Sequence, residues 1–262
     1  MKTRSDWDKA KELSRYDNRA RSSLEHKDNT FNKVWGSASM PTFLRSPYIF
    51  YEESIAIFVK PYHRVLELGS GTGLYTFCLL KTGAQVVASD ISLNSLHLLE
   101  RDLNSETVNL TIQVADIESL PFEDNSFDVV TSAGSLSYGD PGKVDHEILR
   151  VLKPNGIFIC VDSLNHNPIY RINRWIHYLK GERTLSTLHR IPDFNRIKSM
   201  GRNFEEVEVK FFGSTSWFIP IFPLFIGDEK SKEISDNLDR KITYEWLKYL
   251  AFKFVMIAKN SD

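Results

Sequence analysis

Short apolar runs alternate with amphipathic segments through the middle of the chain. Four runs have the length and composition of buried strands, at residues 65–68, 85–88, 127–131 and 157–161, and residues 110–116 alternate as a further strand that ends in an acidic residue. Three segments between them have the apolar spacing of helices, at residues 74–81, 93–103 and 145–152. Strands that alternate with helices form a parallel sheet with helices on both faces. The pattern therefore predicts an α/β fold.

The flanks of the chain carry further elements. The pattern predicts helices over residues 6–26, 48–59 and 191–200, and strands over residues 204–211 and 251–259. An aromatic run at residues 217–226 contains two prolines and is too short to span a bilayer. We interpret it as part of the core, with an acceptor-pocket wall or a shallow membrane contact as the alternative.

The order of these elements predicts the domain organisation. We expect residues 1–60 to form an N-terminal helical cap, because they precede the first strand of the sheet. We expect residues 61–262 to form one domain with insertions at about 163–200 and 213–248. A chain of 262 residues can bury a full core without dividing into separate domains.

Composition limits the classes of function. Hydrophobic content is 42% and the formal charge is -1, so no basic field would attract nucleic acid. The two cysteines exclude a disulfide framework and favour the cytoplasm. The N-terminus lacks the apolar core of a signal peptide, and we expect no stable membrane insertion. No tight spacing of histidine and acidic residues indicates a metal, and the oligomeric state stays open.

The strongest local signal is a glycine-rich loop after the first apolar run. Residues 65–73 read Val-Leu-Glu-Leu-Gly-Ser-Gly-Thr-Gly, with glycine at alternate positions. Glycine permits a tight turn and a close approach of the backbone to a ligand. Such loops usually hold phosphate, but the Glu67 carboxylate would repel a pyrophosphate. The loop therefore predicts a site for a ligand that carries positive charge.

Acidic residues end the next two apolar runs. Asp90 follows the glycines at the spacing of a ribose-binding carboxylate, about twenty residues on. Asp116 ends the third run, where it could also simply cap a turn. An NAD site would show the same spacing, but its fingerprint requires the third glycine where this chain has Leu74. An NAD-dependent oxidoreductase is therefore the second hypothesis.

Together these motifs resemble class I S-adenosylmethionine-dependent methyltransferases, and more narrowly the small-molecule branch grouped as methyltransferase type 11. Residues 67–73 resemble the first motif of that family. The Leu-Pro-Phe at 120–122, the Phe-Asp-Val-Val at 127–130 and the Leu-Lys-Pro-Asn-Gly at 152–156 resemble its later segments. The resemblance covers about residues 64–162. It implies a Rossmann-like three-layer sandwich with a seven-stranded, mostly parallel sheet and an antiparallel last strand.

The resemblance also implies a cofactor, S-adenosyl-L-methionine, and the residues that hold it. The glycines would leave room for the methionine moiety, Glu67 would favour its positive groups, Asp90 would hold the ribose, and Asp116 with Ile117 the adenine. The candidate cofactor-binding residues are Glu67, Gly69, Ser70, Gly71, Gly73, Asp90, Ile91, Asp116, Ile117 and Ala133.

Two residues are candidates for catalysis, because each follows a strand whose end opens onto the expected crevice. His166 could take a proton from an acceptor hydroxyl, since a neutral imidazole is a competent base; its alternative is a surface or capping role. Tyr138 is the second candidate. Methyl transfer mainly requires alignment of the nucleophile behind the methyl group, so a dedicated base need not exist.

The acceptor is the least determined partner. We expect a small metabolite or glycan precursor, methylated on oxygen rather than nitrogen or carbon. A lipid or quinone acceptor at a membrane surface and a non-catalytic cofactor-binding protein are the alternatives. Residues 169–190 interleave arginines with apolar residues, which indicates either a solvated surface helix or a site for an anionic acceptor.

A lid is implied by the resemblance, because the N-terminal part of related enzymes folds over the ligands. The aromatic and basic candidates are Trp7, Tyr16, Arg19, Phe31, Trp35, Arg45 and Tyr48. Local packing is the alternative for each. Tyr16 and Arg45 are the candidates that we favour.

Overall fold

The computed structural model describes residues 4–25, 33–41, 44–103, 108–213 and 245–262. The aromatic run at 217–226 and nearly all of the insertion expected at 213–248 lie outside these residues.

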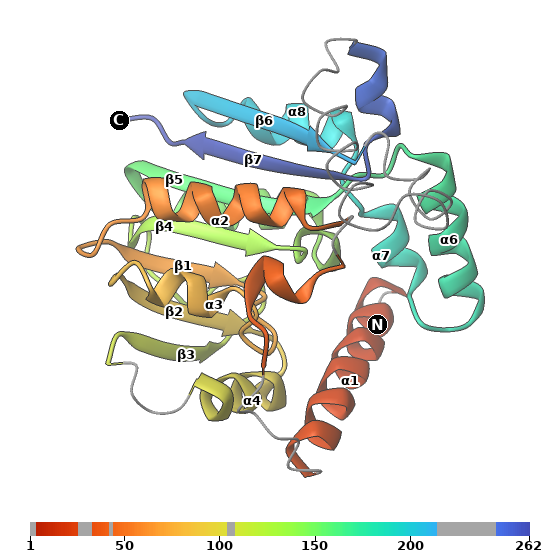
Figure 1. Ribbon diagram of the computed structural model, residues 1–262, viewed down its shortest axis with the longest axis horizontal. Coiled ribbons are helices and arrows are strands. Elements are labelled where there is room, and N and C mark those ends of the chain that lie inside the picture. Colours follow the sequence, from red (N-terminus) through yellow and green to blue (C-terminus); the bar gives the residue numbers. More distant parts are fainter. Residues whose placement is uncertain (1–3, 26–32, 42–43, 104–107, 214–244) are drawn as a thin grey trace.

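The described strands form one seven-stranded sheet in the order β3-β2-β1-β4-β5-β7-β6 (Figure 1). The first five, which are mutually parallel, are β1 (Arg64–Leu68), β2 (Gln85–Asp90), β3 (Leu110–Val114), β4 (Phe127–Ala133) and β5 (Leu152–Ser163). The last two are β6 (Glu206–Phe212) and β7 (Lys253–Lys259), and β7 runs antiparallel to both of its neighbours. The predicted fold class is therefore confirmed.

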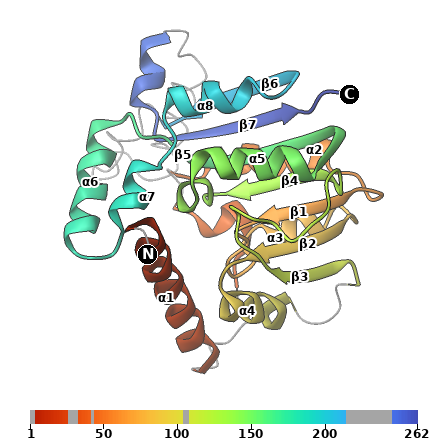
Figure 2. The same cartoon turned by 180° about the vertical axis from the view of Figure 1, so that it is seen from behind.

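Helices cover both faces of the sheet. Figure 1 shows α2 (Ser46–Phe58) and α3 (Thr76–Leu80) on one face, and Figure 2 shows α5 (Pro141–Val151) and α8 (Phe194–Gly201) on the other. The helix α4 (Leu93–Leu103) packs beside β2 and β3 through Leu96 and Leu99. β1 pairs with β2 on one side and β4 on the other, and its two faces are buried in different core clusters, Leu66 and Leu68 in one and Val65 in the other. This explains why the strand sequences are continuously apolar.

The carboxyl ends of the parallel strands point toward a separate group of helices. This group contains α1 (Arg4–Glu25), α6 (Pro168–Leu179) and α7 (Leu185–His189) (Figure 1). Three short 3-10 helices complete the described elements, at Gly36–Ser39 (η2), Leu136–Tyr138 (η4) and Glu245–Leu250 (η6). Open α/β sheets bind ligands at this end, so the topology places a site beneath α1.

Two local predictions were wrong. The strand predicted over 157–161 begins earlier, because the Leu-Lys-Pro-Asn-Gly segment at 152–156 lies inside β5, where a register shift against β4 and a φ of 59° at Asn155 absorb its irregularity. The basic segment predicted as a single helix divides into α6 and α7. Gly181, with a φ of 75°, stands between them and permits the change of direction.

Candidate functional site

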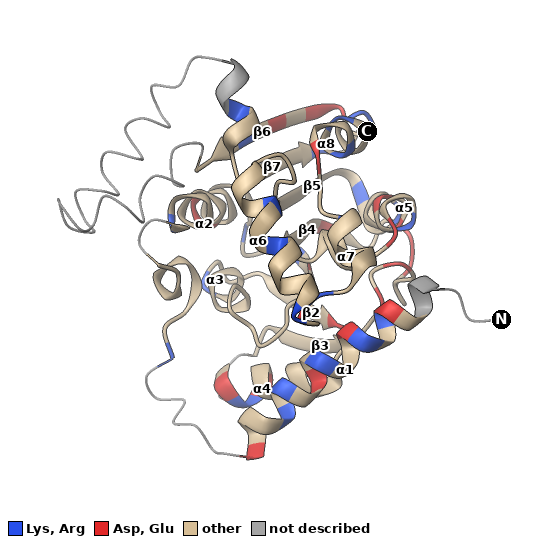
Figure 3. Ribbon diagram, turned by 90° about the vertical axis from the view of Figure 1, so that its right-hand side faces the viewer, with Lys and Arg blue, Asp and Glu red and all other residues tan. Residues whose placement is uncertain are grey.

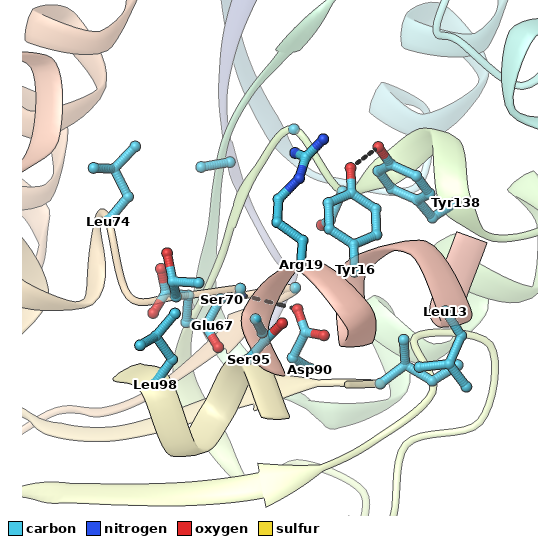
Figure 4. A pocket seen from close by; sticks show the side chains of 18 of the residues that line it. Leu13, Tyr16, Arg19, Glu67, Ser70, Leu74, Asp90, Ser95, Leu98 and Tyr138 are labelled. Atoms are coloured by element: carbon cyan, nitrogen blue, oxygen red, sulfur yellow. Dashed lines mark hydrogen bonds between the residues drawn. The ribbon is translucent and has the colours of Figure 1, made fainter. Parts of the chain in front are cut away.

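A cavity of about 730 Å³ lies at the carboxyl ends of β1, β2, β3 and β4, and α1 closes its outer side (Figure 4). Its inner wall comes from the glycine loop and from the residues that follow the other strands. Its outer wall includes Lys9, Leu13, Tyr16 and Ala20, which recur every three or four residues along α1. The size lies in the range of pockets that hold small-molecule ligands and cofactors.

The three glycines of the loop adopt left-handed backbone conformations, with φ of 64° at Gly69, 54° at Gly71 and 84° at Gly73. A Cβ atom on Gly69 would lie 2.5 Å from the Ser135 Cβ, so this glycine is required for packing. A Cβ atom on Gly71 would meet nothing within 4 Å. Because Gly71 lines the cavity, that open space belongs to the ligand-binding side of the loop.

Two carboxylates flank this loop. Glu67 is 2% exposed, accepts a 2.5 Å hydrogen bond from the Thr76 hydroxyl, and burial raises its pKa to about 7. Asp90 accepts hydrogen bonds from the backbone N–H groups of Gly71 (2.9 Å) and Ser92 (2.8 Å), and burial raises its pKa also. Neither carboxylate forms an ion pair with a described residue. Negative charge at the loop is therefore not neutralised by the protein.

The third predicted acid, Asp116, lies at the far end of the cavity and is tied to α1. Its carboxylate forms an ion pair with Lys9, which also lies 3.4 Å from the Glu118 carboxylate. The second oxygen of Asp116 accepts a 2.9 Å hydrogen bond from the Glu118 N–H. The neighbouring Ile117 and Ile91, which follows β2, also line the wall. Residues that follow β3 and residues of α1 thus together form this part of the cavity wall.

Several cations that the sequence analysis did not predict form ion pairs with acidic residues of the cavity wall. Lys33 lies 2.7 Å from the Asp102 carboxylate and donates to the Thr72 carbonyl, and Arg101 bonds to the same aspartate at 2.9 Å. All four of these residues line the cavity. Because Lys9 pairs with Asp116, the predicted acids without an ion pair among the described residues are Glu67 and Asp90. The three- and four-residue spacing along α1 would have revealed Lys9, but the pairs with Asp102 depend on tertiary contacts.

Tyr138 and Tyr16 meet over the cavity (Figure 4). Their hydroxyl oxygens lie 2.5 Å apart, and the rings pack edge to face with centroids 5.7 Å apart. Burial, followed by the nearby Tyr16 hydroxyl, raises the pKa of Tyr138 above its ordinary value. Tyr138 is therefore a neutral hydrogen-bonding phenol near neutral pH.

The structure does not bring His166 to the cavity. Its Nε2 accepts a 3.0 Å hydrogen bond from the Phe194 N–H, and its ring stacks on the Phe194 ring at 4.2 Å. Burial lowers the pKa of His166. These contacts give the imidazole a packing role between β5 and α8, which is the alternative considered from the sequence.

The predicted lid residues divide into two groups. Tyr16 and Arg19 line the cavity. Trp35 stacks on Phe77, Tyr48 stacks on Tyr75, and Arg45 donates to the backbone carbonyls of Met40 and Ala38, so these three pack locally. Trp7 is 66% exposed, and Phe31 lies outside the described residues.

The site fits a cofactor that has a cationic part and a ribose. Glu67, Asp90, Ser70 and Gly71 all line the cavity. In the part of the chain that the structure describes, neither carboxylate has an ion pair, the buried Ser70 hydroxyl has no hydrogen-bond partner, and the space at Gly71 is open. Ala133 and Gly134 leave the end of β4 free of large side chains. Within the described ranges, no group of three or more histidine, cysteine or acidic residues is placed to hold a metal.

Comparisons with known proteins agree with this geometry. Residues 66–160 match a family model described as a methyltransferase domain. The demethylmenaquinone methyltransferase of Clavibacter sepedonicus is 42% identical over 110 residues, which cover 41% of this chain and 44% of that protein. The chain spans less than half the length of the first curated relatives that it matches.

Solved structures extend the likeness to almost the whole fold. Phosphoethanolamine N-methyltransferase 2 of Haemonchus contortus, solved with S-adenosyl-L-methionine, superposes with a TM-score of 0.61 at 19% identity, covering 94% of this chain and 57% of that one. The [4+2]-cyclase SpnF gives a TM-score of 0.60 at 17% identity, covering 96% and 95%. The chain therefore carries, at residues 66–160, a methyltransferase domain of the class I, S-adenosylmethionine-dependent family, in the type 11 branch.

Proposed function

We propose that this protein transfers a methyl group from S-adenosyl-L-methionine to a small-molecule acceptor. The observation that carries the proposal is the pair of carboxylates at the glycine loop, the buried Glu67 and the half-buried Asp90, which have no ion pair in the described structure. Removing charge from water is costly unless a partner compensates it. A ligand with a sulfonium and an ammonium group supplies that compensation, whereas a dinucleotide pyrophosphate would add to the repulsion.

The resemblance to the family suggests the remaining cofactor contacts. Gly69, Ser70 and Gly71, which line the cavity, would hold the methionine moiety, with Ala133 at the end of β4 beside it. Gly73 does not line the cavity but packs against Leu99, so it would act by shaping the loop. Asp90, with Ile91 next to it, would accept hydrogen bonds from the ribose hydroxyls. Asp116 would receive the adenine amino group, with Ile117 against the ring. Since Lys9 already binds Asp116, α1 and the adenine would share this carboxylate.

The bound cofactor supplies an activated methyl group, so the protein must mainly position the nucleophile and exclude water. α1 performs the exclusion in this proposal, because Asp17 holds it to the start of α4 through Ser92 and Asn94. At its other end, the Asp8 carboxylate accepts hydrogen bonds from Ser186 on α7. We retain residues 1–60 as a cap over the domain at 61–262, with insertions at about 163–200 and 213–248.

The cavity wall favours acceptors that lose their proton readily. None of the described lining residues is a histidine or a cysteine, and the raised pKa of Tyr138 prevents it from acting as a base near neutral pH. An aromatic hydroxyl compound, such as a phenol or hydroquinone, needs no strong base and can accept a hydrogen bond from Tyr138. The similarity to a demethylmenaquinone methyltransferase supports an aromatic acceptor of the quinone type, but it gives no support to oxygen as the methylated atom. We keep oxygen as the favoured nucleophile on the Tyr138 contact alone.

Two specific observations favour other acceptors or chemistry. Arg19 lines the cavity and forms no ion pair among the described residues, so it could receive an anionic acceptor group. The arginines of the 169–190 segment do not line the cavity. The fold of the cyclase SpnF is similar, so a class I fold alone does not require methyl transfer.

A screen with methyl-labelled cofactor tests the proposal. The purified protein is incubated with labelled S-adenosyl-L-methionine and separate panels of phenols and hydroquinones, amines, and carboxylates. We expect thermal stabilisation by the cofactor and label transfer to the aromatic hydroxyl panel. Label on amines alone would overturn the oxygen preference. Stabilisation by NAD, with no response to S-adenosyl-L-methionine or its demethylated product, would overturn the function itself.

The Tyr16–Tyr138 contact gives a further prediction. Tyr16→Phe and Tyr138→Phe each remove the hydrogen bond between lid and sheet, which is worth about 1 kcal/mol, so each should weaken cofactor binding about fivefold. Calorimetric titration of both variants and of the double variant checks this. If the hydroxyls act as one latch, the double variant binds no more weakly than either single variant. Additive losses would show that the two hydroxyls act separately.

A further inference from the structure

The helix α6 presents its large apolar side chains to solvent. Ile172 is 63% exposed and Leu179 is 78% exposed. Ile169, Trp175 and Ile176 are each nearly half exposed and lie at the same helical spacing. These five residues form one continuous stripe, called the α6 stripe below. A helix that belongs only to a protein core would turn such a stripe inward.

The inward side of α6 is fixed by polar and aromatic contacts, so the stripe cannot rotate into the protein. Asn167 caps the helix, accepting hydrogen bonds from the N–H groups of Ile169 and Tyr170. The Tyr170 ring stacks on Phe252 with centroids 4.8 Å apart. The buried Arg174 donates a 3.0 Å hydrogen bond to the Leu164 carbonyl. These contacts therefore fix the stripe in its outward orientation.

Positive charge borders the α6 stripe. The helix contains no aspartate or glutamate, and the exposed Arg171 and Lys180 lie on opposite sides of the stripe at 100° per residue. Lys11 and Arg183 lie beside Leu179 in an adjoining surface hollow. Glu182, which follows the helix, is bonded to His177. Figure 3 shows α6 with basic and uncharged residues only, on the same face of the molecule as α1.

We propose that α6 docks this protein onto the surface of an anionic lipid bilayer. An outward apolar stripe with cations on both sides and at one end matches the boundary of a bilayer, where acyl chains take up the apolar residues and lipid phosphates contact the cations. Trp175 sits within the stripe, as tryptophan does at membrane interfaces. No described helix is long and apolar enough to cross a bilayer, so the contact is peripheral.

Docking through α6 would place the α1 side of the molecule at the membrane. Since α1 forms the outer wall of the cavity, this side of the site would then face the bilayer. An acceptor dissolved in the bilayer would reach the site from the lipid. Binding to vesicles does not require methyl transfer, so failure of this inference would leave the proposed function intact.

Vesicle co-sedimentation of the full chain tests the proposal. We expect binding to phosphatidylglycerol/phosphatidylcholine vesicles and weak binding to phosphatidylcholine alone. Ile172→Glu should reduce binding at least about tenfold, because it places a charge in the apolar stripe. Ile57→Glu is the matched control, since Ile57 is 60% exposed on α2, and it should bind as the parent chain does.

Two further variants separate the physical contributions. Arg171→Gln with Lys180→Gln should remove the preference for the anionic vesicles. Trp175→Phe should reduce the blue shift of tryptophan emission on vesicle addition. Equal binding by Ile172→Glu and the parent chain would overturn the proposal. The proposal would also be overturned if the parent chain bound no vesicles and self-associated, and Ile172→Glu lost that self-association. The stripe would then be the contact with a second copy of the chain.

Discussion

Gly71→Ala should abolish cofactor binding while the protein stays folded. A Cβ atom at this position meets no protein atom within 4 Å but enters the cavity space beside the loop. We expect the affinity for S-adenosyl-L-methionine to fall at least about a hundredfold, because the ligand approaches the glycine backbone closely. The left-handed backbone, with a φ of 54°, adds a stability cost of about 1 kcal/mol.

Gly181→Ala is the matched control for that variant. Gly181 also has a left-handed backbone, with a φ of 75°, and open space around its Cβ position, but it does not line the cavity. Both variants should lose similar stability in thermal unfolding, and only Gly71→Ala should lose binding in calorimetric titration. An unchanged dissociation constant for Gly71→Ala would show that the cofactor does not lie against this loop.

Glu67→Gln should stabilise the free protein against unfolding and weaken its binding of the cofactor. The folded pKa of Glu67 is about 7 against an ordinary value of 4.5, so the folded state holds the proton more tightly than the unfolded state. This carboxyl therefore lowers folding stability progressively as pH rises from about 4.5 to about 7, and the penalty is complete above that range. A neutral glutamine avoids it and keeps an oxygen for the Thr76 hydroxyl, so unfolding near pH 8 should cost about 2 kcal/mol more.

The negative charge of Glu67, which destabilises the free protein, should strengthen cofactor binding. A cationic ligand favours the ionised form of Glu67, whose pKa in the free protein is about 7, so the affinity of the parent chain should rise about tenfold from pH 6 to pH 8 and level off above that. In Glu67→Gln, this pH dependence should disappear and binding near pH 8 should weaken at least about tenfold. Titrations at several pH values decide the matter. The same pH profile in both chains would remove Glu67 from the electrostatics of binding.

The sequence determined the fold class, the family and most element positions. Helix α4 spans Leu93–Leu103 as predicted, and Ser92 caps it by accepting a hydrogen bond from the Ser95 N–H. The central strands were predictable because they are buried on both faces and are therefore continuously apolar, as Leu66 and Val130 show, whereas the edge strands β3 and β6 are largely exposed and alternate. The glycine loop and the acids that follow the strands were predictable because their chemistry is local to one strand end. Their roles toward the cofactor stay predictions.

The tertiary structure decided which of the candidate residues meet. The sequence alone could not show that Tyr16 reaches Tyr138, that Lys9 reaches Asp116, or that His166 packs on Phe194 instead of facing the cavity. Nor could it show the direction of α6. An apolar stripe has the same sequence pattern whether it faces the core or the solvent, and here the contacts of Tyr170 and Arg174 set its orientation. Local patterns specify elements, whereas the pairing of residues far apart in the chain depends on how those elements pack.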